Sequence, residues 1–488
     1  MRKVSAWLRT HPWLASAGGI VAFCATLHLF LNWQAEQRWQ RYAAEARARG
    51  VQLTLPEFAR PEIPDEVNFA ALPLLRTAFS SGGRSSFAWP VTSRTRPSFG
   101  DVLRGERIDW TIWQRHFQEA GFLTEISADP VRDTLRALDH YAPQFEQWSQ
   151  WRTRPQCRFA LDLEAGAAMP LPHLTVFMDA SKVFGLKMRA HLAVGESAAG
   201  YGAFRENWQA YQALRFDPTL ISGLVRISVL STICARVGDG LMDRAWAEPE
   251  LRQLDADFAT VGLWEDYRLA MASERGFHNS IANSLAEASP SARGQMIATF
   301  INGAPALGTS STQLPAIVGT LLPKRIYRDN QLRQNHYFDE MLAGVSADGT
   351  RFDPDRPTPS APEAIENPVE QYYYFLNRIS APTYRLIEQR YLALKITLDQ
   401  IRLAIALERH RLARGAYPEM LSGLVPEFCA ELPRDIFSDG LYRYRRTDEG
   451  SFVLYSLGQN RRDDQGRLDR TKREKEQLDS VWLYAPPP

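Results

Sequence analysis

The sequence predicts a mainly α-helical protein with a small α+β head at its C-terminal end. Apolar residues recur at the three-to-four spacing of helices through most of the chain, and the spacing changes to two only beyond Gly415. One long apolar run near the N-terminus has the length of a single membrane-spanning helix. With 488 residues, 45% hydrophobic and 23% charged, the chain is expected to form two or three folded units and is too polar for a transporter with many spans.

The charge balance argues against a nucleic-acid partner. The chain has 57 Lys and Arg residues against 56 Asp and Glu residues, which gives a net charge of +1. Proteins that bind nucleic acid usually present an excess of positive charge, because contacts to phosphate supply much of the affinity. We therefore expect no nucleic-acid partner.

Residues 13–33 are predicted to form a transmembrane anchor. The run over residues 13–31 contains no Asp, Glu, Lys or Arg, and at about 1.5 Å per residue it nearly matches a hydrocarbon core of about 30 Å. Trp13 and Trp33 bracket it, as aromatic residues do at membrane surfaces. A cleaved secretory signal is the alternative, but such a signal has a shorter apolar region followed by a small-residue cleavage site. The run favours an uncleaved anchor whose partner is the lipid bilayer.

The orientation of this anchor is inferred from the short tail that precedes it. Residues 1–12 contain no acidic residue, which favours a cytoplasmic tail and export of the remaining chain. Positive residues flank both ends of the span, so the Lys and Arg bias alone does not decide. We expect a single-pass protein of the cytoplasmic (inner) membrane whose C-terminal bulk is extracytoplasmic.

Residues 34–60 are predicted to form a helical stalk, and residues 61–347 an all-helical domain. The stalk is polar and rich in Ala and Arg, and Pro56 and Pro61 follow it as helix breakers. In the domain, apolar residues repeat with the helical period over most of the length. The clearest predicted helices are 110–120, 130–151, 174–194, 201–214, 218–241 and 249–260.

Residues 348–368 are rich in proline and are predicted to be a linker to a last unit over residues 369–488. This unit begins with a long helix, which Gly415 and Pro418 terminate. Polar and apolar residues then alternate in 441–446 and 451–456, which predicts a β-hairpin, and a last strand is predicted at 481–484.

The segment from Asp399 to Tyr484 resembles the soluble half of the major pseudopilins of type II secretion systems. It follows their order: a helix ending in Gly-Ala-Tyr-Pro at 415–418, then Pro-Arg-Asp, a hairpin with Tyr-Arg-Tyr, and Ser-Leu-Gly at 456–458. The rest of the chain, with Ile-Pro-Asp-Glu-x-Asn-Phe-Ala-Ala from Ile63, resembles an uncharacterised family of membrane-anchored proteins of bacteria such as Verrucomicrobia and Planctomycetes. The resemblance implies a pseudopilin-like head outside the cytoplasmic membrane, linked to secretion or pilus-like machinery.

The resemblance also implies a calcium site in the head, because major pseudopilins carry Ca²⁺ in the loop after Ser-Leu-Gly. The matching residues here are Asn460, Asp463, Asp464 and Asp479, whose oxygen atoms suit a hard cation. Several Arg and Lys residues in the same loop oppose a bound cation. A solvated, charged loop is the alternative.

The sequence contains none of the common catalytic motifs. Gly-x-Ser-x-Gly, Walker and Gly-x-Gly-x-x-Gly sequences are missing, as is His-Glu-x-x-His. His336, Asp339 and Glu340 share a helical face that suits a carboxylate metal site, as do Glu265 and Asp266 on another segment, but exposed helices often carry such spacings. We expect a structural or protein-interaction role at the envelope, with an envelope protein as partner. The alternative is an envelope hydrolase or carbohydrate-active enzyme with its cleft in the helical domain.

Overall fold

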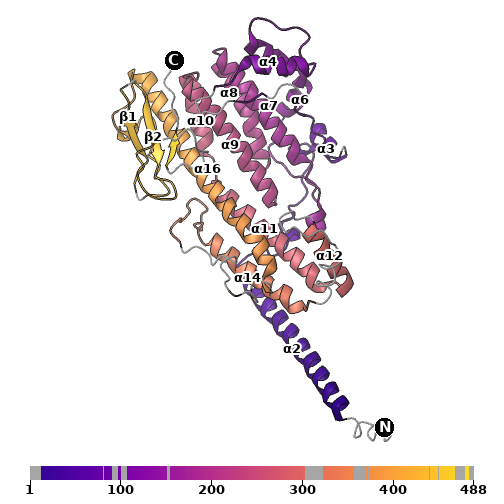
Figure 1. Cartoon of the computed structure of the whole chain (residues 1–488). Helices are drawn as coiled ribbons and strands as arrows, with labels where there is room; N and C mark the ends of the chain where they lie inside the picture. Colours follow the sequence, from indigo (N-terminus) through magenta and orange to yellow (C-terminus); the bar gives the residue numbers. More distant parts are fainter. Residues whose placement is uncertain are drawn as a thin grey trace.

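The computed structural model describes residues 12–80, 82–90, 97–99, 107–150, 154–302, 322–356, 367, 370, 373–438, 440–448, 450–467 and 479–482. Within them the chain is mainly helical and has one small three-stranded antiparallel sheet, as predicted (Figure 1). The predicted tail before residue 12 and most of the predicted linker lie outside the described residues.

The helices lie in the following order along the chain. They are α2 (Pro12–Ala48), α3 (Pro73–Ser80), α4 (Trp110–Glu119), α5 (Pro130–Leu138), α6 (Ala142–Ser149), α7 (His173–Ala193), α8 (Ser197–Ala213), α9 (Leu220–Met242), α10 (Glu248–Ala259), α11 (Leu263–Glu287), α12 (Pro290–Asn302), α14 (Lys324–Leu342) and α16 (Phe375–Arg414). The strands are β1 (Arg443–Arg446), β2 (Phe452–Ser456) and β3 (Ser480–Trp482).

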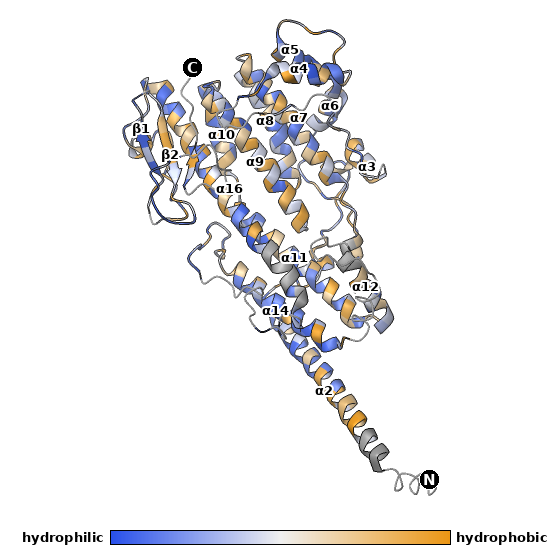
Figure 2. Cartoon of the chain, viewed as in Figure 1, coloured by the Kyte–Doolittle hydropathy of each residue, from blue (hydrophilic) through white to orange (hydrophobic). Residues whose placement is uncertain are grey.

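The first half of α2 projects from the body, and its described side chains are largely exposed. Ile20, Val21 and Phe23 are 64%, 68% and 67% exposed, although all three are apolar. Figure 2 shows this apolar stretch continuing toward the free end of the helix. The predicted span begins at residue 13, and its side chains are described from Gly18 onward.

The second half of α2 is helical and packs into the core of the body. Ala35, Trp39, Ala43 and Ala46 are buried, and this half of the helix lies against α14. Their spacing of three or four places them on one face. Because six of the eight residues between them are Glu, Gln or Arg, the sequence of this segment resembles a solvated helix.

Among the described residues, one helix is long and apolar enough to cross a membrane, and it is α9. Half of its most apolar stretch is buried, and Val229, Leu230 and Ile233 lie in the main hydrophobic core. Burial of this kind is typical of a core helix. α9 is packed between α7, α8, α11 and α16.

The predicted helix over 130–151 is broken in the structure. α5 ends at Leu138, a short 3₁₀ turn follows, and α6 begins at Ala142. Pro143 lies in the first turn of α6, where a backbone N–H has no partner within the helix, so its absence costs no hydrogen bond. In one continuous helix over 130–151, the same proline would leave a hydrogen bond unmade. The break directs Trp148 into the core, where its ring lies edge-on to Phe87 at 5.5 Å.

α16 connects the base of the body to the head. Its 40 residues span about 60 Å at about 1.5 Å per residue. The predicted apolar seam is confirmed, since its residues from Tyr384 to Ile405 are buried against α9, α10, α11 and α14. Gly415 ends the helix in the left-handed conformation at φ 79°, as the sequence predicts. One hydrophobic core extends from Phe69 to Leu454, so residues 61–347 and 369–488 share it.

The predicted hairpin of the head is confirmed. β1 pairs with β2 through Tyr444 opposite Leu454, and β2 pairs with β3 through Tyr455 opposite Val481. The sheet is fixed to α16 by the side chain of Gln400, which donates to the carbonyl of Ser480 at 2.7 Å.

Candidate functional site

The best-defined candidate site is the joint between α2 and the body. It is built around two carboxylates, Glu36 on α2 and Asp329 on α14. Arg38 Nη2 lies 2.8 Å from Asp329 Oδ1 on α14. Glu36 accepts from Lys324 and from Arg328, each at 2.9 Å. Burial alone would raise the pKa of Glu36, but hydrogen bonds from Gln40, Lys324 and Arg328 lower it to about 2. The carboxylate therefore stays ionised at any physiological pH.

Two further contacts hold α2 one turn above and one turn below this pair. Below it, the side chain of Asn32 accepts a hydrogen bond from the backbone N–H of Arg325 at 2.9 Å. Above it, Tyr42 donates to Asp339 at 2.8 Å, and Arg275 of α11 lies 3.1 Å from the same carboxylate. Contacts at three successive levels of one helix fix its direction relative to the body.

Buried amides lock α14 against α11 behind the joint. The side chain of Asn335 donates to Asn279 at 2.6 Å, and that of Gln331 donates to the same oxygen at 3.2 Å. All three residues are buried. Buried amides that bond one another favour a single register, because any shift would leave polar groups without partners.

The start of α16 meets the same joint. Tyr373 donates to Asp329 Oδ2 at 2.5 Å, and Asn377 donates to Gln334 at 2.7 Å. Burial raises the pKa of Tyr373, and its hydrogen bond to Asp329 raises it further. Asp329 thus receives bonds from α2, from α16 and, through Arg325 at 3.2 Å, from its own helix. One carboxylate therefore holds three segments of the chain together.

The structure places the predicted calcium residues in one loop of the head, with most of their oxygens already in use. Asp463 accepts from Tyr455 at 2.9 Å, and Asn460 donates to Asp464 at 3.0 Å. Asp479 accepts from the N–H of Gly466 at 2.9 Å, while its second oxygen is buried without a partner. Burial raises the pKa of Asp479, and the nearby charges of Asp464 and Asp463 raise it further. In the part of the chain that is described, no three His, Cys, Asp or Glu side chains are close enough to hold a metal ion.

The predicted acidic faces on helices have structural partners. Asp266 is buried and forms an ion pair with Arg226 of α9, whereas Glu265 faces outward to Arg215 at 3.1 Å. Asp339 belongs to the joint through Tyr42. The two faces therefore do not converge on one site.

A hollow between the segments 58–60, 157–163 and 213–218 holds residues that the sequence does not single out. Its volume is about 440 Å³, including the open mouth. Asp217 and Cys157 line it, and buried His173 lies 2.7 Å from Asp217. Burial and the charge of Asp217 raise the pKa of the Cys157 thiol, which opposes formation of a nucleophilic thiolate.

The joint could not be predicted from the sequence either. The first turns of α14 resemble a solvated helix face, because their sequence is Lys-Arg-Ile-Tyr-Arg-Asp-Asn-Gln. The available signal is the Ala and Trp stripe of residues 35–46, which requires a partner helix. Comparison of the chain with protein-family models, with curated proteins and with solved structures finds no match.

Proposed function

We propose that this chain is a membrane-anchored envelope protein with a structural or protein-interaction role. The anchor is the first half of α2, from residue 13 to residue 33. The observation that carries the proposal is that the described side chains of this half, from residue 18 to residue 33, are largely apolar and exposed, while the second half is fixed in the body. A row of exposed Ile, Val, Phe and Leu side chains is unfavourable in water and favourable in a bilayer.

The contacts of the joint favour a role for α2 in fixing the orientation of the body, in contrast to a flexible linker. A flexible linker would let the body rotate above the membrane, whereas α2 passes into the body without a break and is bonded at Asn32, Arg38 and Tyr42. Because Tyr373, two residues before α16, bonds to Asp329, the length of α16, about 60 Å, separates the head from the anchor. The head is held at this distance to meet an envelope partner, and its resemblance to pseudopilins favours secretion or pilus-like machinery.

An enzymatic role has weaker support. The hollow beside Cys157 is the feature that favours it, but the thiol there is buried and its pKa is raised. The aromatic run at residues 372–375 is the feature that would favour carbohydrate binding. Tyr373 bonds Asp329, and Tyr374 lies under the guanidinium of Arg333 at 4.5 Å, so both rings have partners within the chain.

A topology experiment tests the proposal. Alkaline phosphatase and a fluorescent protein that matures only in the cytoplasm are fused separately after Pro488, in the full chain and in a control lacking residues 1–33. We expect phosphatase activity without fluorescence for the full chain, and loss of membrane association in the control. Fluorescence without phosphatase activity would place the body in the cytoplasm and contradict an extracytoplasmic role.

Proximity labelling from the same C-terminal position tests the interaction role. We expect components of an envelope assembly among the labelled proteins. Labelling of abundant membrane proteins alone, at the level seen with an unrelated anchored protein, would contradict it.

A further inference from the structure

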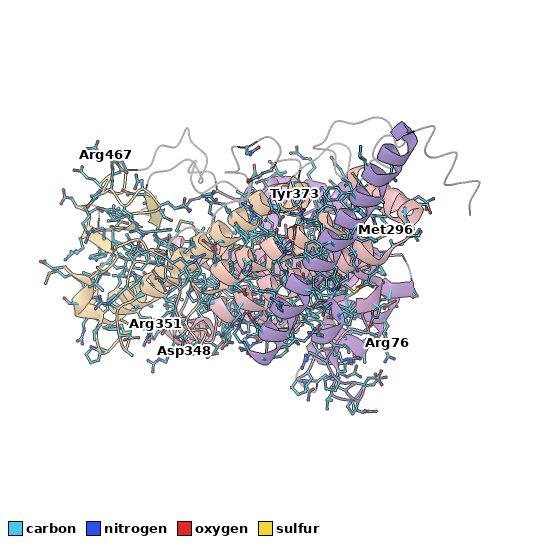
Figure 3. All side chains as sticks on the ribbon, turned by 90° about the horizontal axis from the view of Figure 1, so that it is seen from below. Arg76, Met296, Asp348, Arg351, Tyr373 and Arg467 are labelled. Carbon is cyan, nitrogen blue, oxygen red and sulfur yellow. The ribbon has the colours of Figure 1, made fainter. Side chains whose placement is uncertain are left out.

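The base of the body, beside the point where α2 leaves it, presents a surface that the anchor alone does not explain. α12 forms one part of this surface, and Figures 1 and 3 show it beside α2. Its inner side packs through Ile297 against Leu285 and Tyr327. Its outer side exposes Gln295 and Met296, and Met296 is labelled in the view from below.

α12 has no charged side chain on its outer side. Its one charged residue, Arg293, is buried and donates to the carbonyls of Leu285, Ala288 and Leu322 at 2.8, 3.0 and 2.9 Å. This contact fixes α12 to the end of α11. The sequence then contains no Asp, Glu, Lys, Arg or His from Gly294 to Pro323. A surface helix of a soluble body normally carries charged residues on its outer face, so the outer side of α12 suits a less polar environment than water.

The first turn of α14 supplies positive charge at the same level. Lys324 and Arg325 contact α2 at Glu36 and Asn32, immediately above the apolar stretch, and their side chains stay 34% and 35% exposed. Trp33 of α2 lies at this level and is also exposed. Along α2 and the start of α14, apolar residues are followed by an aromatic ring and then by Lys and Arg. Membrane proteins show this order at the boundary between lipid and water.

We propose that α12 and the first turn of α14 form a second membrane contact, which lies on the lipid headgroups beside the anchor. The inference rests on the proposed function, because it requires α2 to span the bilayer. Met296 contacts the boundary between headgroups and acyl chains, as apolar residues of interfacial helices do. The exposed parts of Lys324 and Arg325, which also pair with Glu36 and Asp329, lie at the level of the lipid phosphates and donate hydrogen bonds to them. Together the anchor and this contact fix the tilt of the body on the membrane.

Fluorescence quenching by lipid-attached nitroxides tests the inference in the full chain. The protein is reconstituted in vesicles of phosphatidylethanolamine and phosphatidylglycerol that contain a lipid with a nitroxide near its glycerol group. An environment-sensitive dye is attached at one cysteine in each sample, with Cys429 replaced by Ser and with Cys157 and Cys234 left buried. In the first sample the dye is attached to the native Cys24. In the second and third samples Cys24 is replaced by Ala, and the dye is attached at Met296→Cys or at Met420→Cys.

Met420 is the matched control for Met296. It is an exposed methionine, and it lies beyond the head end of α16, about 60 Å along that helix from the joint. We expect the nitroxide lipid to reduce emission from Cys24 and from position 296 by comparable fractions, and to leave emission from position 420 unchanged.

The other outcomes separate the two proposals. Quenching at Cys24 without quenching at position 296 would overturn the second contact and leave the anchor. No quenching at either position would contradict the anchor itself. Equal quenching at positions 296 and 420 would mean that the body lies along the membrane, which also overturns a contact confined to the base. Resistance of each variant to trypsin, compared with the unmodified chain, checks that the body is folded.

Discussion

Arg38 and Tyr373, which are far apart in the chain, bind the two oxygens of one carboxylate. Arg38 on α2 lies 2.8 Å from Asp329 Oδ1, and Tyr373 at the start of α16 lies 2.5 Å from Asp329 Oδ2. α2 and α16 are the two longest helices of those described, at 37 and 40 residues. A single side chain on α14 therefore joins α2 to the residues that lead into α16, the helix that carries the head.

Asp329→Asn is expected to loosen this joint. The change removes a charge that Arg38 and Arg325 both contact, and Asp329 is buried. Because loss of one partner leaves buried polar groups unsatisfied, we expect the unfolding free energy to fall by about 1 to 3 kcal/mol. Chemical denaturation of the full chain in detergent measures it.

The control for this change is Asp65→Asn. Asp65 also pairs with an arginine, at 2.5 Å from Arg76, but both side chains are more than half exposed. Exposed pairs usually contribute less than about 1 kcal/mol, so we expect little change. Equal losses for both variants would show that Asp329 has no special role in the joint.

Gly240→Ala is expected to destabilise the body. A Cβ atom at this position would lie 2.4 Å from Nε1 of Trp246 and 2.7 Å from Leu192. The Trp246 ring cannot move freely, because it donates to the carbonyl of Val237 at 3.1 Å. Overpacking of this kind costs about 1 to 3 kcal/mol.

Gly202→Ala in α8 is the matched control, because nothing lies within 4 Å of its Cβ position. Alanine favours a helix over glycine by about 1 kcal/mol, so this variant is expected to gain stability. Thermal unfolding measures both variants. A similar loss for both would indicate a backbone effect and contradict the packing argument.

The spacing of apolar residues and the residues that end helices predict much of this fold. They do not predict which polar side chains are buried against each other. The long helix that ends at Gly415 and the hairpin that follows could be predicted, because a left-handed glycine and a change of period act locally. The embedding of residues 34–48 could not, because Glu36 and Arg38 read as solvated until their partners on α14 are known. The same holds for Asp266, whose partner Arg226 lies on another helix.

Glu274→Gln is expected to change how stability depends on pH. Burial raises the pKa of Glu274 to about 7, against the ordinary value of 4.5, although a hydrogen bond from Tyr384 at 3.1 Å opposes the shift. Between these two pH values the folded chain binds more protons at this site than the unfolded chain does, so the site lowers stability as pH rises. Glutamine stays neutral, and we expect it to stabilise the protein relative to wild type by about 3 kcal/mol more at pH 8 than at pH 4.

The comparison of variant with wild type isolates Glu274 from other groups that titrate in this range, such as His278, whose pKa desolvation lowers to about 4. Tyr384→Phe provides a second test, because loss of its hydrogen bond raises the pKa of Glu274 further and steepens the decline with pH. A difference between Glu274→Gln and wild type that does not vary with pH would contradict a buried, titrating carboxyl.

The calcium site that the resemblance implies predicts that Ca²⁺ stabilises the head. Asp479 has one buried oxygen without a partner, and its carboxyl lies near the like charges of Asp463 and Asp464. A divalent cation would relieve this repulsion, and binding to the folded state alone adds about 2.7 kcal/mol when free Ca²⁺ exceeds the dissociation constant a hundredfold. The bonds of Asp463 to Tyr455 and of Asp464 to Asn460 must open first, which predicts millimolar rather than micromolar affinity.

Thermal unfolding of the full chain with CaCl₂, and again after excess chelator, measures this effect. We expect Asp479→Asn to abolish the rise in Tm, because it removes the negative charge of the carboxyl whose second oxygen is buried without a partner. Asp448→Asn, in the exposed turn between β1 and β2, is expected to keep it. Since Mg²⁺ requires near-octahedral geometry at shorter distances, it is not expected to replace Ca²⁺. An unchanged Tm at about 100 mM Ca²⁺, a hundredfold above a millimolar dissociation constant, would contradict the implied calcium site.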